Sequence, residues 1–141
     1  MYAPLAYVIA ALSRTAPVAL LLLATCCRDV ETAKRVETIR QKVDLNMLQE
    51  WAVRMLTEYP AGRTFEMKDL PPIVRSIPSF GFAGPFVNMS RQAPKDDRAV
   101  VISYIGSFDF YWSLEVGSPS YRRQTNRRCI ELIAGVYYTE R

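Results

Sequence analysis

The first 27 residues carry a single charge, on Arg14, and the rest of this stretch is strongly apolar. Two charge-free runs, residues 2–12 and 16–27, lie on either side of a short Ser-Arg-Thr break. A membrane-spanning helix needs about 20 consecutive apolar residues, and neither run reaches that length alone. Arg14 in the middle of one continuous span would cost about 2.5–3.5 kcal/mol of insertion free energy, which a long apolar segment offsets. The stretch therefore predicts either an uncleaved membrane anchor or a cleaved export signal.

The export signal fits residues 14–27 well. Arg14 supplies the positive end, and residues 16–25 supply an apolar region within the usual range of about 7–15 residues. The following Leu23-Ala24-Thr25-Cys26 resembles the lipobox of bacterial lipoproteins, although Thr25 stands where glycine, alanine or serine is usual. That resemblance implies a lipidated Cys26 at the start of the mature chain, with Cys27 as the other lipidation candidate, and a location in the bacterial envelope. A third interpretation makes residues 1–27 two buried helices of a soluble domain.

Composition excludes several kinds of chemistry. The 141 residues include no histidine, so Ser-His-Asp and Cys-His catalysis and histidine metal sites are absent. The three cysteines, Cys26, Cys27 and Cys129, form no CxxC pair, and we therefore expect no metal and no cofactor. Beyond residue 27 the chain holds 17 basic and 14 acidic residues, a net charge of +3. Nucleic-acid-binding domains usually have a stronger basic excess, which argues against a nucleic-acid partner.

Two helices are predicted between residues 29 and 59. Apolar residues recur there at steps of three and four, with a break at Asp44, which is a good N-cap. Pro60 and Gly62 end the second helix. We expect a signal peptide or membrane anchor over residues 1–27, a helical stalk over 28–44 and a small α+β domain over 45–141.

The second half of the chain has the two-residue period of strands. Residues 99–105 are almost wholly apolar and predict a fully buried strand, whereas 110–116 alternate and predict a half-buried one. A further strand is predicted over 130–138. The proline-rich stretch 60–98 predicts a short helical turn after Asp69 and a short strand or an ordered loop near residues 80–89. The predicted fold class is α+β, with an amphipathic helix packed on a small antiparallel sheet of at least three strands.

The most concentrated charge lies between the last two predicted strands, so we expect it on an exposed loop. Grouped guanidinium groups bind phosphate or carboxylate, and near a bilayer they favour anionic lipid headgroups. A simple solvated loop is the alternative. The cluster consists of Arg122, Arg123, Arg127 and Arg128.

Three further side chains are candidates for ligand binding. Tyr111 and Glu115 share the polar face of one predicted strand, and Tyr137 lies opposite its apolar neighbours, so the two tyrosines are binding candidates if both are exposed. Glu115 and Asp109 are about 20 Å apart on an extended chain, at ~3.3 Å per residue, so they cannot form an acid–base pair within one strand. Cys129 is expected to be a small buried hydrophobe.

These patterns leave three hypotheses about function. The first is a membrane-tethered or exported noncatalytic binding or scaffold module, held by its N-terminus and working with an unknown envelope protein or anionic ligand. The second is a small hydrolase or transferase that uses carboxylates and arginines; Glu115 or Asp109 in a pocket beside the arginine loop would favour it. The third is a binder of anionic lipid or nucleic acid through residues 122–128.

Overall fold

The computed structural model of the chain describes residues 28–60, 62–80, 83–89, 98–106, 110–123 and 128–140. The chain divides into two compact units, residues 1–35 and residues 36–141. Residues 28–35 of the first unit are helical, and an ion pair of 3.0 Å between Arg35 and Glu31 links successive turns. The predicted signal or anchor, with Cys26 and Cys27, lies outside the described residues. Across the described ranges, no helix is long and apolar enough to cross a membrane.

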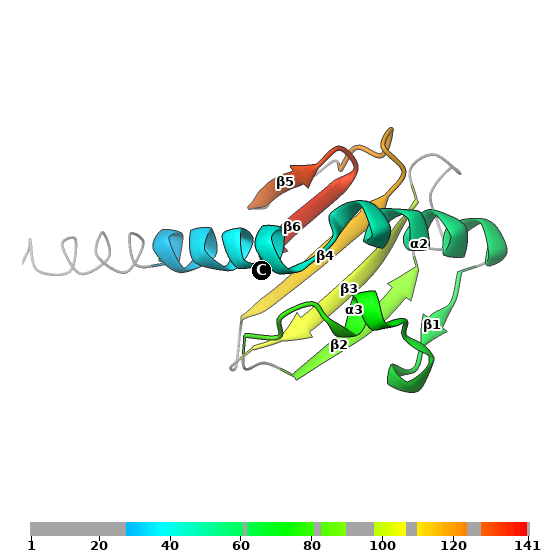
Figure 1. The fold of residues 1–141 in the computed structure, drawn as a ribbon, viewed down its shortest axis with the longest axis horizontal. Coiled ribbons are helices and arrows are strands. Elements are labelled where there is room, and N and C mark those ends of the chain that lie inside the picture. Colours follow the sequence, from blue (N-terminus) through cyan, green and yellow to red (C-terminus); the bar gives the residue numbers. More distant parts are fainter. Residues whose placement is uncertain are drawn as a thin grey trace, which may run out of the picture. The chain divides into compact units, whose positions relative to one another are not determined.

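The second unit is an α+β domain, as predicted: helices pack on a six-stranded antiparallel sheet (Figure 1). The strand order across the sheet is β1-β2-β3-β4-β6-β5, so each strand lies beside its neighbour in sequence except at the β4–β6 pair. The strands are β1 (Thr64–Phe65), β2 (Ala83–Met89), β3 (Ala99–Ile105), β4 (Tyr111–Gly117), β5 (Cys129–Ile133) and β6 (Val136–Glu140).

The predicted helix over residues 45–59 is confirmed as α2 (Leu45–Glu58). Asp44 is its N-cap, as expected, and accepts a hydrogen bond of 3.0 Å from the amide of Met47. Leu48, Trp51 and Ala52 form a buried stripe on the side that contacts β3 and β4. Residues 36–42 are also helical and contribute apolar side chains to the same core, namely Val36 and Ile39, with Val43 following.

Two short helices complete the layer that covers the sheet. They are the 3-10 helix η1 (Met67–Asp69) and α3 (Pro72–Arg75). The predicted helical turn after Asp69 is therefore found, with a proline in its first turn and with Val74 and Ile77 buried.

The prediction of one strand over residues 130–138 was wrong. This stretch is a hairpin, in which β5 and β6 are joined by a turn at Ala134 and Gly135. Gly135 has a φ of +83°, which favours glycine. The register irregularity between Glu131 and Ile133 restores the pairing of even-numbered with even-numbered residues, so Ile130 and Tyr138 lie opposite each other on one face. The alternation in the sequence therefore continued unbroken through a reversal of the chain.

The other strands differ from their predictions in smaller ways. β3 has the predicted bounds, but its two faces differ: Val100, Ile102 and Tyr104 are fully buried on one face. On the other face Ala99 is buried, Val101 and Ser103 are half-buried and Ile105 is exposed. Residues 86–89, predicted as a short strand or an ordered loop, belong to β2, which begins at Ala83. The sheet thus has a helix face, covered by the helices, and a second face that the helices do not cover.

Aromatic rings fill one end of the helix face. Trp112 lies between Tyr104, at 4.1 Å between ring centroids, and Tyr138, at 5.6 Å, and Phe80 packs against its edge at 5.6 Å. Trp112, Tyr104 and Tyr138 are almost completely buried. Burial raises the pKa of the Tyr104 hydroxyl well above its ordinary value, so this ring is neutral at physiological pH. The stack joins three adjacent strands on the side where the helices pack.

Two polar side chains connect α2 to the sheet. Gln49 of α2 donates hydrogen bonds of 2.9 and 2.8 Å to the carbonyl oxygens of Gly117 and Ala134, at the end of β4 and in the β5–β6 turn. Arg98, next to β3 and 7% exposed, donates to the carbonyl oxygens of Leu56 and Tyr59 at the C-terminus of α2. A cation at this position also complements the negative end of the helix dipole.

We predict that Arg98→Ala lowers the free energy of unfolding by about 2 kcal/mol, because charge-assisted hydrogen bonds to two helix-end carbonyls are lost. Urea denaturation followed by circular dichroism measures the change. Arg54→Ala is the control. Arg54 is exposed on α2, and its substitution should lower the free energy of unfolding by less than about 0.5 kcal/mol. Equal stability of the two variants would contradict the role of Arg98.

Candidate functional site

Three of the predicted binding residues, Tyr111, Glu115 and Tyr137, lie on the second face of the sheet. Tyr111 and Glu115 lie on this face of β4, and Tyr137 lies on the same face of β6, where it pairs with Glu115 across the two strands. The segment that follows β4, residues 118–123, contacts this face through Tyr121. Residues from three places in the sequence therefore meet at one end of the sheet.

An ion pair forms the polar centre of this region. Arg123 pairs with Oε1 of Glu115, and the Tyr121 hydroxyl donates a hydrogen bond of 3.1 Å to the other carboxylate oxygen, Oε2. The side chains of Arg123 and Glu115 are 6% and 12% exposed. The expectation that Arg123 lies on an exposed loop was therefore wrong, because residues 118–123 fold back onto the sheet.

Tyr137 is also buried, although its position on the strand suggested exposure. Its ring packs edge-on against Tyr121 at 5.8 Å between centroids, and its hydroxyl donates to the Tyr121 carbonyl oxygen at 3.3 Å. Burial, followed by the nearby Glu131 carboxylate, raises the pKa of Tyr137. Tyr121, Tyr137 and Ala99 form a second small core, so Tyr137 contributes to the packing of this face.

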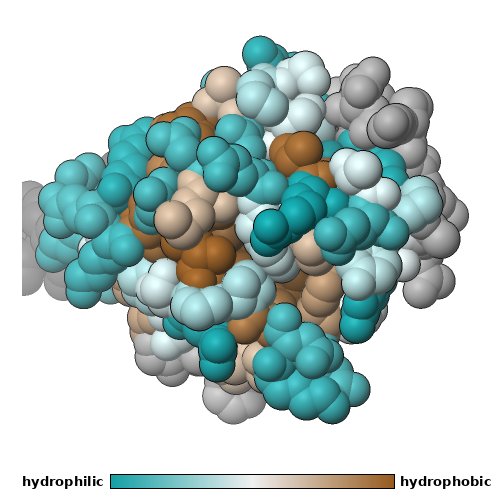
Figure 2. Space-filling model, turned by 45° about the vertical axis from the view of Figure 1, so that its right-hand side comes forward, coloured by the Kyte–Doolittle hydropathy of each residue, from teal (hydrophilic) through white to brown (hydrophobic). Residues whose placement is uncertain are grey.

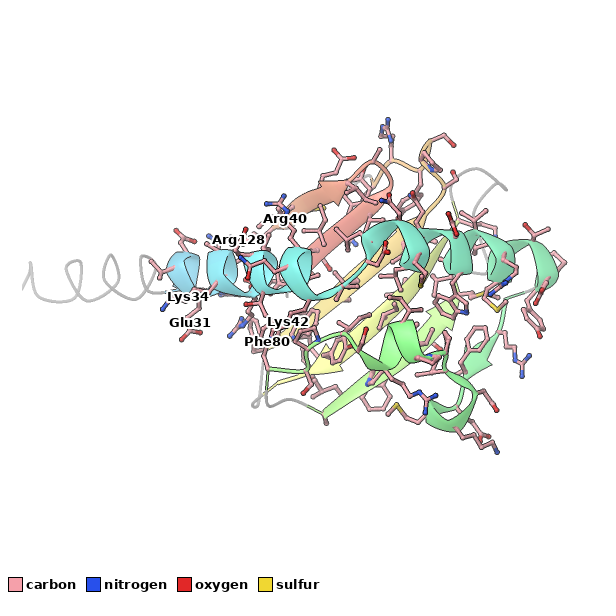
Figure 3. All side chains as sticks on the ribbon, viewed as in Figure 1. Glu31, Lys34, Arg40, Lys42, Phe80 and Arg128 are labelled. Carbon is pink, nitrogen blue, oxygen red and sulfur yellow. The ribbon has the colours of Figure 1, made fainter. Side chains whose placement is uncertain are left out.

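The other arginines of the predicted cluster separate. Arg122 is exposed and donates to the carbonyl oxygens of Pro119 and Tyr121. Arg128 lies 3.9 Å from the carboxylate of Glu140, which is fully buried and also accepts a hydrogen bond of 2.7 Å from the Tyr138 hydroxyl. Figure 3 shows Arg128 at the end of the domain where Arg40 also lies, and Arg40 donates to the carbonyl oxygen of Glu131 in β5. Arg127 and Asp109 lie outside the described residues.

Beside the ion pair, the second face has a hollow of about 320 Å³. Its lining combines an apolar group, hydroxyl groups and the Glu115 carboxylate: Val101, Ser103, Tyr111, Trp112, Ser113 and Glu115. Tyr111 is 44% exposed, so it is the one predicted tyrosine that remains available at the surface. Ser113 shares a hydrogen bond of 2.7 Å with Thr139 of β6.

Two exposed apolar side chains on the same face were missed from the sequence. Phe86 of β2 and Ile105 of β3 are 48% and 40% exposed, and Ile105 pairs directly with Tyr111. Both were assigned to a buried or undefined segment. Ile105 lies two residues after Ser103, so strand alternation places both on the same face. The face on which Phe86 lies depends on an irregularity in the β2–β3 register.

Cys129 lies near the ion pair and is half-buried. Burial is the main cause of its raised pKa; the Glu131 carboxylate adds to the shift and the Arg123 guanidinium opposes it. A raised pKa leaves less thiolate at neutral pH, which is the reactive form. Within the described residues, no group of three or more cysteine and carboxylate side chains is arranged to hold a metal ion.

Comparison with protein-family models, curated proteins and solved structures gave no match.

We predict that Glu115→Ala and Arg123→Ala each lower the free energy of unfolding by about 3 kcal/mol or more, because each leaves a buried charge without its partner. The double variant should lose clearly less than the sum of the two, as expected for groups that interact directly. Lys68→Ala is the matched control, since Lys68 forms a highly exposed ion pair with Glu66 and should cost less than about 1 kcal/mol. Additive losses would mean that Glu115 and Arg123 act separately.

We predict that iodoacetamide modifies Cys129 more slowly than a cysteine in an unfolded peptide at pH 8. Burial and a raised pKa both reduce the available thiolate, so the rate should rise with pH and increase sharply in denaturant. Peptide mass mapping separates Cys129 from Cys26 and Cys27. If Cys129 reacts as fast as a cysteine in an unfolded peptide, its thiol is not buried and its pKa is not raised.

Proposed function

We propose that this chain is a membrane-tethered or exported noncatalytic binding module of a bacterial envelope. We further propose that it binds a segment of an envelope protein on the second face of its sheet, with an apolar side chain of the partner in the hollow. The apolar residues 1–27 support the tether. The observation that carries the binding role is the hollow, with exposed Tyr111, Phe86 and Ile105 on the same face.

The chemistry of this face favours a protein partner over an anionic one. Aromatic residues are enriched at protein interfaces, and Tyr111 offers a large apolar ring with a hydroxyl group. The Glu115 charge is balanced by Arg123, so the hollow presents hydroxyl and apolar groups in place of a net positive charge. A volume of about 320 Å³ is at the lower end of small-molecule sites and suits one or two side chains.

A small carboxylate- and arginine-dependent enzyme is the second candidate, because Glu115 does line a hollow beside Arg123. Both oxygens of this carboxylate already have partners, Arg123 and Tyr121. A general base must be free to take a proton from a substrate. This arrangement therefore supports a structural role for Glu115 better than a catalytic one.

Binding of anionic lipid or nucleic acid through residues 122–128 is the third candidate. Each described arginine of that cluster interacts with the domain's own acceptors: Arg122 with carbonyl oxygens, Arg123 with Glu115 and Arg128 with Glu140. A guanidinium group whose N–H donors already contact these acceptors has fewer donors left to bind a phosphate group. This candidate predicts binding that weakens steeply as salt rises.

The binding role is tested by placing a photo-crosslinking amino acid at position 111 of the whole protein in expressing cells. We expect a discrete crosslinked product, lost when Ser103→Tyr fills the hollow or Ile105→Asp places a charge beside it. The matched control places the same amino acid at Met67, which is also exposed and apolar but lies on η1. Equal crosslinking from both positions, or none from position 111, would count against a partner on this face.

The tether is tested by the intact mass of the protein extracted from membranes. A chain that begins at Cys26 or Cys27 with added acyl mass would establish a lipoprotein, and a full-length chain in membranes would establish an uncleaved anchor. A full-length chain confined to the soluble fraction would contradict the tether. This outcome is independent of the crosslinking result.

A further inference from the structure

A second hollow lies on the opposite side of the sheet, in the helix layer. It is a groove of about 360 Å³ between α2 and the start of α3. One wall consists of α2 residues at helical spacing, and the other consists of residues at the beginning of α3. The lining residues are Met47, Glu50, Trp51, Arg54, Pro71, Pro72 and Ile73.

The floor and one wall of this groove are apolar. Trp51 forms the floor and is 6% exposed, since its ring also packs against Phe65 in the core, at 6.0 Å between centroids. Met47 is 55% exposed, although the other apolar residues of α2 are buried or half-buried. Methionine is a flexible side chain that adapts to different partners, and is common at binding surfaces. Figure 2 shows that apolar surface on this side of the molecule occurs in patches bordered by hydrophilic residues.

The border of the groove has one charge of each sign. Glu50 and Arg54 are exposed and stand four residues apart on α2, a spacing that places them on neighbouring turns. Among the described residues, neither has a hydrogen-bond or ion-pair partner. A purely apolar ligand that filled the groove would remove water from both charges without replacing it, which is costly. An occupant that brings an acidic and a basic group as well as an apolar surface would complement both charges.

We propose that this groove binds an amphipathic helix of a partner protein. Its apolar stripe would pack on Met47 and Trp51, an acidic residue would pair with Arg54, and a basic residue would pair with Glu50. The wall from Met47 to Arg54 covers two helical turns, about 10.5 Å at 1.5 Å per residue, which matches two turns of a docked helix. An amino acid or other small zwitterion would leave most of that length empty. Because this groove and the hollow beside Tyr111 are on opposite faces of the sheet, the domain would bind two partners at once.

The test uses a displayed library of 14-residue helical peptides, selected against the purified whole protein. We expect the enriched peptides to share an apolar stripe bordered by one acidic and one basic position. Arg54→Glu should weaken the binding of these peptides about tenfold, and Lys42→Glu should not, although it makes the same kind of charge change on another exposed helical residue. The double variant Glu50→Arg/Arg54→Glu should prefer peptides in which the acidic and basic positions are exchanged.

Circular dichroism confirms that each variant keeps its fold, which is expected because the substituted side chains are exposed. Enriched peptides that lack the charged positions, or that bind equally well to the Arg54→Glu variant, overturn the proposal. So does a selection that enriches no peptide. Peptides that lose binding with Ile105→Asp but not with Arg54→Glu would place recognition on the second face. They would support the proposed function while rejecting this groove.

Discussion

The structure depends on burying one face of an antiparallel sheet under its helices. Val100, Ile102 and Tyr104 of β3, with the facing residues of β4 and β6, form a continuous apolar layer beneath α2. The stacked rings around Trp112 extend this layer to the end of the sheet. Once that face is buried, the alternation of side chains leaves the opposite face without a helical cover. The hollow and the exposed side chain of Tyr111, where we propose that a partner binds, lie on this uncovered face.

The second face is closed in part by the chain itself. Residues 118–123 fold over its β5–β6 end and bury Tyr137 and the Glu115–Arg123 pair. A buried ion pair contributes little net stability compared with apolar side chains of similar volume, but it is costly to break. It therefore fixes where this segment lies on the sheet. Glu115, which lines the hollow, is held by the same interactions.

Arginine side chains serve mainly internal roles in the described domain. Arg98 closes the C-terminus of α2, Arg123 neutralises Glu115 and Arg128 lies near the buried Glu140. This use explains why a cluster of arginines in sequence does not become a cluster of cations in space. Arg54 has no such internal acceptor among the described residues, and it lies exposed beside an apolar groove. The position of a charge relative to the sheet, and not the number of charges, decides whether it is available to a partner.

The elements with a strong local pattern could be predicted from the amino-acid sequence. The helical period and the Asp44 cap gave α2, and the alternation in residues 110–116 gave β4 to within one residue, because these signals come from neighbours in the chain. The division of the chain into anchor or signal, stalk and domain stays a prediction. Of the candidate site, the sequence correctly placed Tyr111 and Glu115 on the polar face of their strand.

Which of those residues stay accessible depends on tertiary packing. The hairpin reversal at Gly135, the return of residues 118–123 onto the sheet, and the pairing of Arg123 with Glu115 depend on how whole segments pack, which the periodicity of a single segment does not encode. Strand alternation reports the face on which a side chain lies, but not what later covers that face. Tyr111 and Tyr137 had the same pattern in sequence, and burial by Tyr121 separated them.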